Sequence, residues 1–316
     1  MITPHLHRHC QVTTQRGIDH LVIAVNDLSA ARDRFSSFGF RTTPLGKQPW
    51  GTANHLVQFP GNFIELVGVV DPGALVPMSE EHFSFSAHND RFLRRREGMS
   101  MLVLSSEDAR ADAAEWRERG LHVYEPVHWS RKATLPDGNE LTVAFTLAFV
   151  TNPSMPEIAF FACQQHNPEA FWKPEYQQHE NGATAISGVT LVADTPGEHA
   201  AFFSRLLGGA RIEEETDALS IHTGRGVIHV QSPRCFAAHY SSVRPRDDAQ
   251  GTVLMAASVD VADLDRLADC LEEHGVAFSR DDTAIQLADH QCCGVVLEFV
   301  QIQGQAPGGT RAHDHE

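Results

Sequence analysis

The chain of 316 residues lacks long apolar runs, an excess of positive charge and paired cysteine motifs. No window approaches the roughly 18 consecutive apolar residues of a transmembrane helix, and the first residues lack the apolar core of a signal peptide. With 25 Lys and Arg against 41 Asp and Glu, the formal net charge is −16, which excludes a constitutive basic surface for nucleic acid or an anionic membrane. The six cysteines form no Cys-x-x-Cys pair. We therefore expect a reduced, cytoplasmic protein with no nucleic-acid and no membrane partner.

What the sequence does contain is an internal repeat. A strand-like segment, a helix with one apolar face and further apolar stretches begin near residues 18, 99, 188 and 252. In the first copy, residues 18–25 read as the strand, Asn26-Asp27 as the cap of the helix and Gly39 as its end. The order strand–helix–strand–strand–strand recurs four times in register, which is more than chance repetition explains.

The repeat predicts two pseudo-symmetric halves of two modules each. Turn-forming residues in the connection, including Pro168 and Pro174, separate the halves. The expected boundaries are a disordered tail at 1–15, a first domain at 16–166 with modules 17–70 and 98–166, a connection at 167–183, a second domain at 184–303 with modules 184–232 and 250–303, and a disordered tail at 304–316.

Several segments of the first half resemble one known superfamily. Residues 17–28 resemble the opening strand of the vicinal oxygen chelate superfamily, which includes glyoxalases, bleomycin-resistance proteins and extradiol dioxygenases. The segments that resemble its glyoxalase-like branch are 51–56, 63–67, 163–168 and 179–183. The resemblance covers about residues 17–303. It implies an α+β fold in which paired modules form two domains, each a curved mixed sheet that encloses a cup, with helices outside.

The two-residue period of a strand indicates which side chains enter the first cup. Leu21 and Ile23 are large and apolar and are expected to face the helix, so His20 faces the other side. By the same parity Ile64 faces the helix and Glu65 faces inward. The resemblance places metal ligands at these two positions. An imidazole and a carboxylate suit Fe(II), Mn(II), Zn(II) or Ni(II). Alternatively, His20 and Glu65 are a hydrogen-bonded pair in a polar cavity.

The second module departs from the superfamily pattern. The position equivalent to His20 falls near Met99 or Met101, and the position equivalent to Glu65 falls near Phe160. Neither residue type binds a hard cation. A complete site would recruit His128 or His166, or water and substrate would supply the remaining ligands.

In the second half, Gly188 occupies the place of His20, while His229 and Glu298 occupy the place of Glu65 in the third and fourth modules. One His and one Glu facing each other form a weak second site. We favour a degenerate half that buttresses the first.

Other polar side chains could position a substrate. Thr52, Asn54 and Gln58 share one face of their strand and are expected to line the cup, whereas His55 is not. Arg131 could bind a carboxylate, or it is simply a charge on an edge strand. The run at residues 91–97, which contains four arginines, is expected to be a solvated helix face rather than an anion-binding patch.

The leading hypothesis is a metal-dependent enzyme of lyase or isomerase type that binds two adjacent oxygens of a small substrate. His20 and Glu65 would hold the metal, and Glu65 or a cup histidine such as His128 would transfer protons. Ring-cleaving dioxygenase activity is less favoured, because the resemblance would require ligands in the second half, where only Glu298 matches. The alternatives are a metal-free binding protein of bleomycin-resistance type and a structural protein with a vestigial cup. The resemblance also allows a homodimer formed across sheet edges.

Overall fold

The computed structural model describes residues 16–134, 140–240 and 251–302, so the tails expected at 1–15 and 304–316 lie outside the described residues. The elements of the first half are β1 (Ile18–Ala24), α1 (Leu28–Ser37), β2 (Gly46–Lys47), β3 (Thr52–Phe59), β4 (Asn62–Val69), η1 (Pro72–Ala74), α2 (Phe85–Leu93), β5 (Gly98–Ser106), α3 (Ala109–Glu118), β6 (His122–Val123), β7 (Val127–Thr134), β8 (Glu140–Thr151) and β9 (Ala159–Gln165). The remaining elements are α4 (Pro168–Phe171), η2 (Pro174–Tyr176), β10 (Ala183–Val192), η3 (Pro196–His199), α5 (Ala200–Leu207), β11 (Arg211–Glu215), β12 (Ala218–His222), β13 (Val227–Gln231), α6 (Pro233–His239), β14 (Val253–Val261), α7 (Leu264–Glu273), β15 (Ser279–Arg280), β16 (Ala284–Leu287) and β17 (Val296–Gln301).

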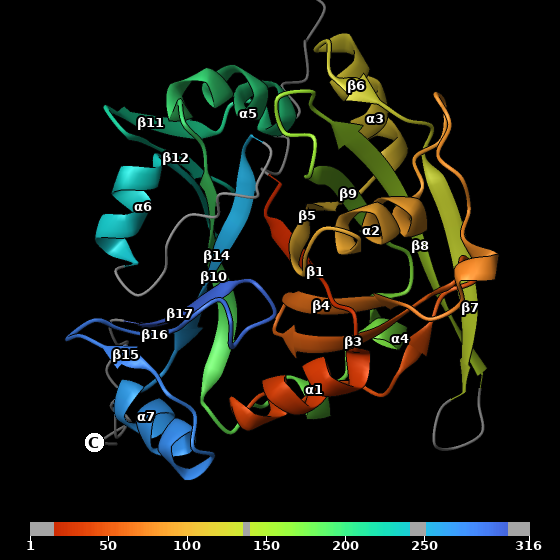
Figure 1. Cartoon of the computed structure of the whole chain (residues 1–316). Helices are drawn as coiled ribbons and strands as arrows, with labels where there is room; N and C mark the ends of the chain where they lie inside the picture. The colour runs from red at the N-terminus through yellow and green to blue at the C-terminus, as the bar shows by residue number, and fades with distance from the viewer. Residues whose placement is uncertain (1–15, 135–139, 241–250, 303–316) are drawn as a thin grey trace, which may run out of the picture.

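The first sheet has the strand order β2-β3-β4-β1-β5-β9-β8-β6, with β7 paired to β8 (Figure 1). β1 pairs in parallel with β4, and β5 pairs in parallel with β9. The two modules meet where β1 and β5 pair in antiparallel fashion. The opening strands of both modules therefore lie side by side at the centre of the sheet.

The second sheet repeats this arrangement in the order β11-β12-β13-β10-β14-β17-β16-β15. β10 and β14 are the antiparallel central pair, and β13 and β17 are their parallel neighbours. The predicted fold class, α+β with four repeated modules paired into two mixed sheets, is confirmed. We propose the domain boundaries given above on the basis of this division. Helices α2 and α6 lie outside the repeat, each between the two modules of its half (Figure 1).

Aspartates begin three of the helices that follow the opening strands. The side chains of Asp27, Asp108 and Asp263 each accept a hydrogen bond from a backbone N–H in the first turn of α1, α3 and α7. Such caps satisfy N–H groups that have no partner within the helix. They fix the direction in which each helix leaves the sheet.

Alternation along the strands divides the apolar side chains between two faces. Leu21 and Ile23 of β1 pack with Phe35 of α1 in one large cluster, as predicted. Val22 and Ala24 point the other way and belong to a second cluster, which surrounds the concave face of the first sheet. The polar residues of the candidate site lie on this second face.

Polar contacts join the two halves within a shared apolar core. The large cluster contains residues of both sheets, among them Ile18 and Ile186. Asn62 is fully buried at the start of β4, where its side chain donates to Ile186 O at 2.9 Å and accepts from Ile186 N at 3.1 Å. Trp116 Nε1 of α3 donates to Leu206 O at 2.7 Å. Because these contacts cross between the halves, we expect the halves to unfold together.

The Asn62→Ala variant is expected to lower the free energy of unfolding by about 2–4 kcal/mol, because two backbone groups of a buried strand lose their partner. Chemical denaturation followed by circular dichroism measures this change. Asn152→Ala is the matched control, because among the described residues the Asn152 side chain accepts hydrogen bonds only from the backbone and hydroxyl of exposed Ser154. A loss in Asn62→Ala no larger than in the control would contradict the proposed role of this contact.

Candidate functional site

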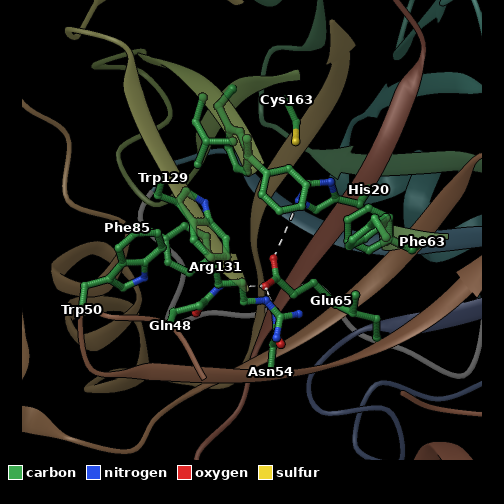
Figure 2. Close-up of a pocket in the computed structure, with 15 residues that line it drawn as sticks. His20, Gln48, Trp50, Asn54, Phe63, Glu65, Phe85, Trp129, Arg131 and Cys163 are labelled. Carbon is green, nitrogen blue, oxygen red and sulfur yellow. Dashed lines mark hydrogen bonds and ion pairs between the residues drawn. The ribbon is translucent and has the colours of Figure 1, made fainter. Parts of the chain in front are cut away.

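The candidate site is a cup on the concave face of the first sheet. Its walls are mainly aromatic, and its polar groups gather at the centre (Figure 2). The lining residues are His20, Gln48, Trp50, Asn54, Leu56, Phe63, Glu65, Phe85, Trp129, Arg131, Phe145, Leu147, Phe161, Cys163 and Phe171. The cavity volume is about 60 Å³, well below the roughly 300–1,000 Å³ of typical small-molecule sites. An ion or a very small group fits the cup as it stands, and a larger ligand requires side chains of the aromatic wall to move.

His20 is fixed in the cup by contacts on three sides. Its Nδ1 lies 2.6 Å from Asp19 Oδ2, and its ring stacks on Phe63 with the centroids 4.1 Å apart. The edge of the Phe161 ring completes the enclosure. Because Asp19 engages Nδ1, the nitrogen left available is Nε2, which lies 3.7 Å from Glu65 Oε2. Figure 2 shows the His20 and Glu65 side chains facing each other at the centre of the cup.

Adjacent strand residues normally point to opposite faces, so the contact between Asp19 and His20 needs a local cause. The pairing of β1 with β5 shifts register between Ile18 and His20, which is the signature of a bulge or similar irregularity. Both side chains are buried and reach each other there. Gln165 Nε2 donates to the second oxygen, Asp19 Oδ1, at 3.3 Å. Strand parity alone does not predict this role for Asp19.

Glu65 is held by amide donors at one oxygen only. Asn54 Nδ2 donates to Glu65 Oε1 at 2.6 Å, and Gln48 Nε2 donates to the same oxygen at 3.3 Å. Thr52 Oγ1 in turn donates to Gln48 Oε1. Oε2 is the oxygen turned toward His20. Asn54 and Thr52, which we expected to contact substrate, thus support the Glu65 carboxylate in this structure. Gln48 also supports it, and the sequence pattern did not predict this role.

Trp129 and Arg131 enter the cup from β7. Trp129 is paired with Phe145 and Arg131 with Val143, so both lie on the face of Phe145, which also lines the cavity. The Arg131 guanidinium lies near the polar centre of the cup. Its Nη2 is 3.8 Å from the position that a Cβ atom added to Gly46 would take, and the Asn54 side chain borders the same position. Arg131 is therefore the cationic group of the cup lining.

His128 and His166 do not reach the cup. His128 is paired with Thr146, one residue away from the Trp129–Phe145 pair, so it faces the opposite side of β7 and β8. Thr146 Oγ1 contacts His128 Nδ1 at 3.1 Å and His166 Nε2 at 2.8 Å. The structure thus gathers these two histidines into a separate cluster, away from His20. It does not support His128 as a proton-transfer group or His166 as a third ligand.

The second module supplies no ligand at the positions equivalent to His20 and Glu65. Strand register makes Met101 the counterpart of His20, and it makes Phe161, next to Phe160, the counterpart of Glu65. Phe160 faces the helix side, because a shift of one residue reverses the face. Among the described residues, no group of three or more His, Cys, Asp or Glu side chains is arranged to hold a metal ion.

Two further side chains have clear placements. Cys163 lines the cup, and burial, together with the charges of Asp19 and Glu65, raises the pKa of its thiol well above the usual range, so it is uncharged. Gln58, expected in the cup, is occupied elsewhere. Its amide donates to Phe171 O at 3.0 Å and accepts from Lys173 N at 3.2 Å. It therefore anchors the connection that carries Phe171 into the cup wall.

The equivalent cup of the second half is filled by its own chain. Phe236 of α6 and the following Tyr240 are buried in a cluster on the concave face of the second sheet. Figure 1 shows α6 beside this sheet. Glu298 accepts hydrogen bonds from His239 at 2.7 Å and Gln286 at 3.0 Å on Oε1, and from Tyr240 at 3.3 Å and Ser258 at 3.0 Å on Oε2.

His229 takes part in a different contact, with Ser220 Oγ at 3.1 Å, and burial lowers its pKa. Since both oxygens of Glu298 are saturated by side chains of the same half, Glu298 and His229 do not form an open pair. This placement favours the buttressing role over a second site.

Together, two sheets of two modules each, with a cup that gathers polar groups in the first half, define a protein of the vicinal oxygen chelate fold. The model of the glyoxalase-like domain family matches residues 18–207, which is more than half of the chain. The chain belongs to this family. No curated protein matches the chain at a significant level.

Solved structures share the fold at low sequence identity. A hypothetical protein from Staphylococcus aureus matches with a TM-score of 0.65 and 12% identity, over 91% of this chain and 100% of that one. A mutant of 4-hydroxymandelate synthase from Streptomyces coelicolor matches with a TM-score of 0.54 and 12% identity, over 94% and 95% of the two chains. The Mn(II)-bound glyoxalase from Novosphingobium aromaticivorans matches with a TM-score of 0.55 and 10% identity, over 91% and 82%. At these identities the matches show the fold alone.

The filled cup of the second half predicts a distinct pH dependence of stability. The hydrogen bond to Glu298 raises the pKa of His239 above its ordinary value of 6.5. Although burial opposes the effect, the same contact lowers the pKa of Glu298 below its ordinary value of 4.5. The contribution of His239 to the free energy of unfolding is complete below pH 6.5 and is lost as the pH rises through the raised pKa. The contribution of Glu298 to the free energy of unfolding is complete above pH 4.5 and is lost as the pH falls through the lowered pKa.

We therefore expect His239→Gln to lower the free energy of unfolding most between about pH 4.5 and 6.5, and less at pH 8 or at pH 3. Urea denaturation at these pH values, compared with wild type, measures the difference. His290→Gln serves as control, because His290 is 78% exposed and lies 4.0 Å from Asp289. A destabilisation that is independent of pH would contradict the ion pair.

Proposed function

We propose that the chain is a glyoxalase-like enzyme of lyase or isomerase type that acts on a small oxygen-bearing substrate in the first cup, with a divalent metal held by His20 and Glu65. The observation that carries the proposal is the line of groups from Asp19 through His20 to Glu65, buried in a cup with mainly aromatic walls. A binding surface with no chemistry to perform has no evident need for an oriented imidazole that faces a carboxylate.

The donor groups fit two positions of a metal ion. Two ligands bound at about 2.0–2.2 Å to one ion lie roughly 3.0–3.6 Å apart, depending on the angle between them. His20 Nε2 and Glu65 Oε2 are 3.7 Å apart, so a small side-chain adjustment would suffice. The carboxylate of Asp19 on Nδ1 is the kind of outer contact that accompanies metal-bound histidines. One imidazole and one carboxylate suit Fe(II), Mn(II), Zn(II) or Ni(II). Such an ion would supply Lewis-acid stabilisation of a developing oxyanion.

The side chains of the cup divide the remaining work. Asp19 fixes the ring orientation of His20 and leaves Nε2 as the reactive nitrogen. Asn54 and Gln48 occupy Glu65 Oε1, so Oε2 is the oxygen left to bind the ion, and its second lone pair could accept or return a proton. The phenyl rings of Phe63 and Phe161 exclude water around His20, which strengthens electrostatic interactions in the cup.

The lining also indicates the substrate. Aromatic side chains dominate the walls, and Arg131 is the cation that lies near the polar centre. A small apolar or aromatic body with a carboxylate would place that group on Arg131 and its reacting oxygens near His20 and Glu65. Ring cleavage of the extradiol type is not proposed, because Glu298 is saturated and α6 fills the second cup.

A metal-free binding protein of bleomycin-resistance type is the second candidate. One observation favours it: the described residues provide only His20 and Glu65 where a complete site needs further ligands. Metal binding and ligand binding, measured separately, distinguish the two functions.

The untagged protein is expected to bind one equivalent of Mn(II), Ni(II), Zn(II) or Fe(II), and His20→Ala and Glu65→Ala are expected to abolish this binding. Asp19→Asn is expected to weaken it by about 10–100-fold, because the outer contact orients the ligand. Elemental analysis and isothermal titration calorimetry measure these quantities.

His122→Ala and Glu125→Ala are the controls, since both side chains are exposed on the same half. Absence of metal binding in the wild type, or equal binding in His20→Ala, would contradict the metal-dependent function. The metal-free binding protein would then be the remaining candidate.

Small aromatic carboxylates such as benzoate are expected to quench the fluorescence of Trp50 and Trp129, both of which line the cup. Arg131→Gln is expected to weaken their binding by about tenfold or more, because a charge-assisted hydrogen bond is lost. Arg117→Gln, which removes an exposed partner of Glu125, is the control. Equal affinities for wild type and Arg131→Gln would show that Arg131 does not receive the carboxylate.

A further inference from the structure

A second cavity lies at the other end of α2, away from the cup. Its volume is about 180 Å³, and its polar lining consists of His88, Arg91, Arg95, Arg96 and Glu157. The arginine run was expected to be a solvated helix face. This prediction is wrong for Arg96, whose side chain is 97% buried, and it overlooks the cavity that Arg91 and Arg95 border.

The cavity lining carries more positive than negative charge. Glu157 is its one carboxylate, and it pairs with both Arg96 and, at 3.3 Å, Arg95. The neighbouring acidic groups act elsewhere: Asp90 pairs with Arg94, and Glu97 accepts from Asn26 N. Three guanidinium groups and one carboxylate therefore line the cavity.

His88 does not add to this charge. It is buried, and burial together with the charge of Arg91 lowers its pKa to about 4, so it is neutral near pH 7. Its Nε2 faces Ser100 O at 3.2 Å, and its Nδ1 faces Arg91 Nη2 at 3.4 Å. The neutral imidazole of His88 thus forms a polar contact with the Arg91 guanidinium without repelling its charge.

The ion pairing in the cavity is also incomplete. Arg96 Nη2 donates to Glu157 Oε2, but the buried Arg96 Nη1 has no hydrogen-bond partner among the described residues. Glu157 Oε1 is buried without a well-formed hydrogen bond, although Arg95 lies within ion-pair distance. An unmet buried donor on a charged group is costly, and native structures normally satisfy it with water or a ligand.

We propose that this cavity binds a small dianion with tetrahedral oxygens, such as a phosphate or the phosphate group of a small metabolite. Arg91 and Arg95 would receive the anion at the exposed edge, and buried Arg96 would lie behind them. Guanidinium groups match the oxygens of such anions with parallel hydrogen bonds. A lining with three guanidinium groups and one carboxylate suits a dianion better than a monocarboxylate.

Inorganic phosphate is the probe, titrated into the full chain at constant ionic strength held with sodium chloride. We expect saturable binding by calorimetry and a rise in Tm with phosphate concentration. Arg91→Gln is expected to weaken phosphate binding by about tenfold, with little change in the Tm measured in chloride, because this side chain is exposed. Arg94→Gln is the matched control and is expected to bind like wild type, because Arg94 is 75% exposed and paired with Asp90.

Glu157→Gln separates a binding site from a purely structural ion-pair cluster. If the cavity receives an anion, loss of the competing carboxylate tightens phosphate binding severalfold even if it lowers the Tm in chloride. Failure of the wild type to bind phosphate up to about 10 mM, or equal binding by Arg91→Gln, would overturn the proposal. Weaker phosphate binding by folded Glu157→Gln would overturn it as well. Metal binding at His20 and Glu65 is measured independently, so the two proposals can fail separately.

Discussion

The orientation of His20 in the first cup depends on the irregular pairing of β1 with β5 between Ile18 and His20. A regular strand would send Asp19 and His20 to opposite faces of the sheet. The irregularity lets Asp19 engage His20 Nδ1, and this contact decides that Nε2 is the nitrogen presented to Glu65. The stacking of Phe63 and the amide contacts on Glu65 then hold the facing partners in place. Neutralising Asp19 would leave Phe63 and Phe161 to hold the ring in place but would remove the contact that distinguishes Nδ1 from Nε2.

The two halves show how one strand position can acquire different chemistry. Glu65 and Glu298 occupy equivalent places beside the central strands, opposite Val22 and Ser258. Glu65 receives its donors on one oxygen, whereas Glu298 receives donors on both, two of them from His239 and Tyr240 at the end of α6. A carboxylate whose lone pairs are satisfied by its own fold is a structural element, and one with a free oxygen in a cavity is available for chemistry. The difference arises from the end of α6, which adds two donors, and from Ser258 of the central strand, which donates to Glu298 Oε2 where β1 has Val22 opposite Glu65.

Features that follow from the two-residue period of strands could be predicted from the sequence. The repeat, the sheet faces and the inward positions of His20 and Glu65 all belong to this class. Errors arose where one residue of register was uncertain. His128 lies opposite Thr146 and faces away from the cup, and the counterpart of Glu65, placed only near Phe160 from the sequence, is Phe161. Asp19 and Gln48 escaped prediction because the register shift in β1 and the turn after the short strand β2 do not follow strand parity.

The limited donor set has a thermodynamic consequence for the proposed enzyme. An ion held by only His20 and Glu65 is bound less tightly than one in a complete site, because each missing ligand leaves a position to solvent. A substrate that offers two adjacent oxygens would raise the affinity of the ion, and by linkage the ion would raise the affinity of the substrate by the same factor. Substrate and metal would then bind cooperatively, because the small cup leaves little room for water at the open positions of the ion. The aromatic walls contribute to this coupling, because they exclude the water that would otherwise compete for the open positions.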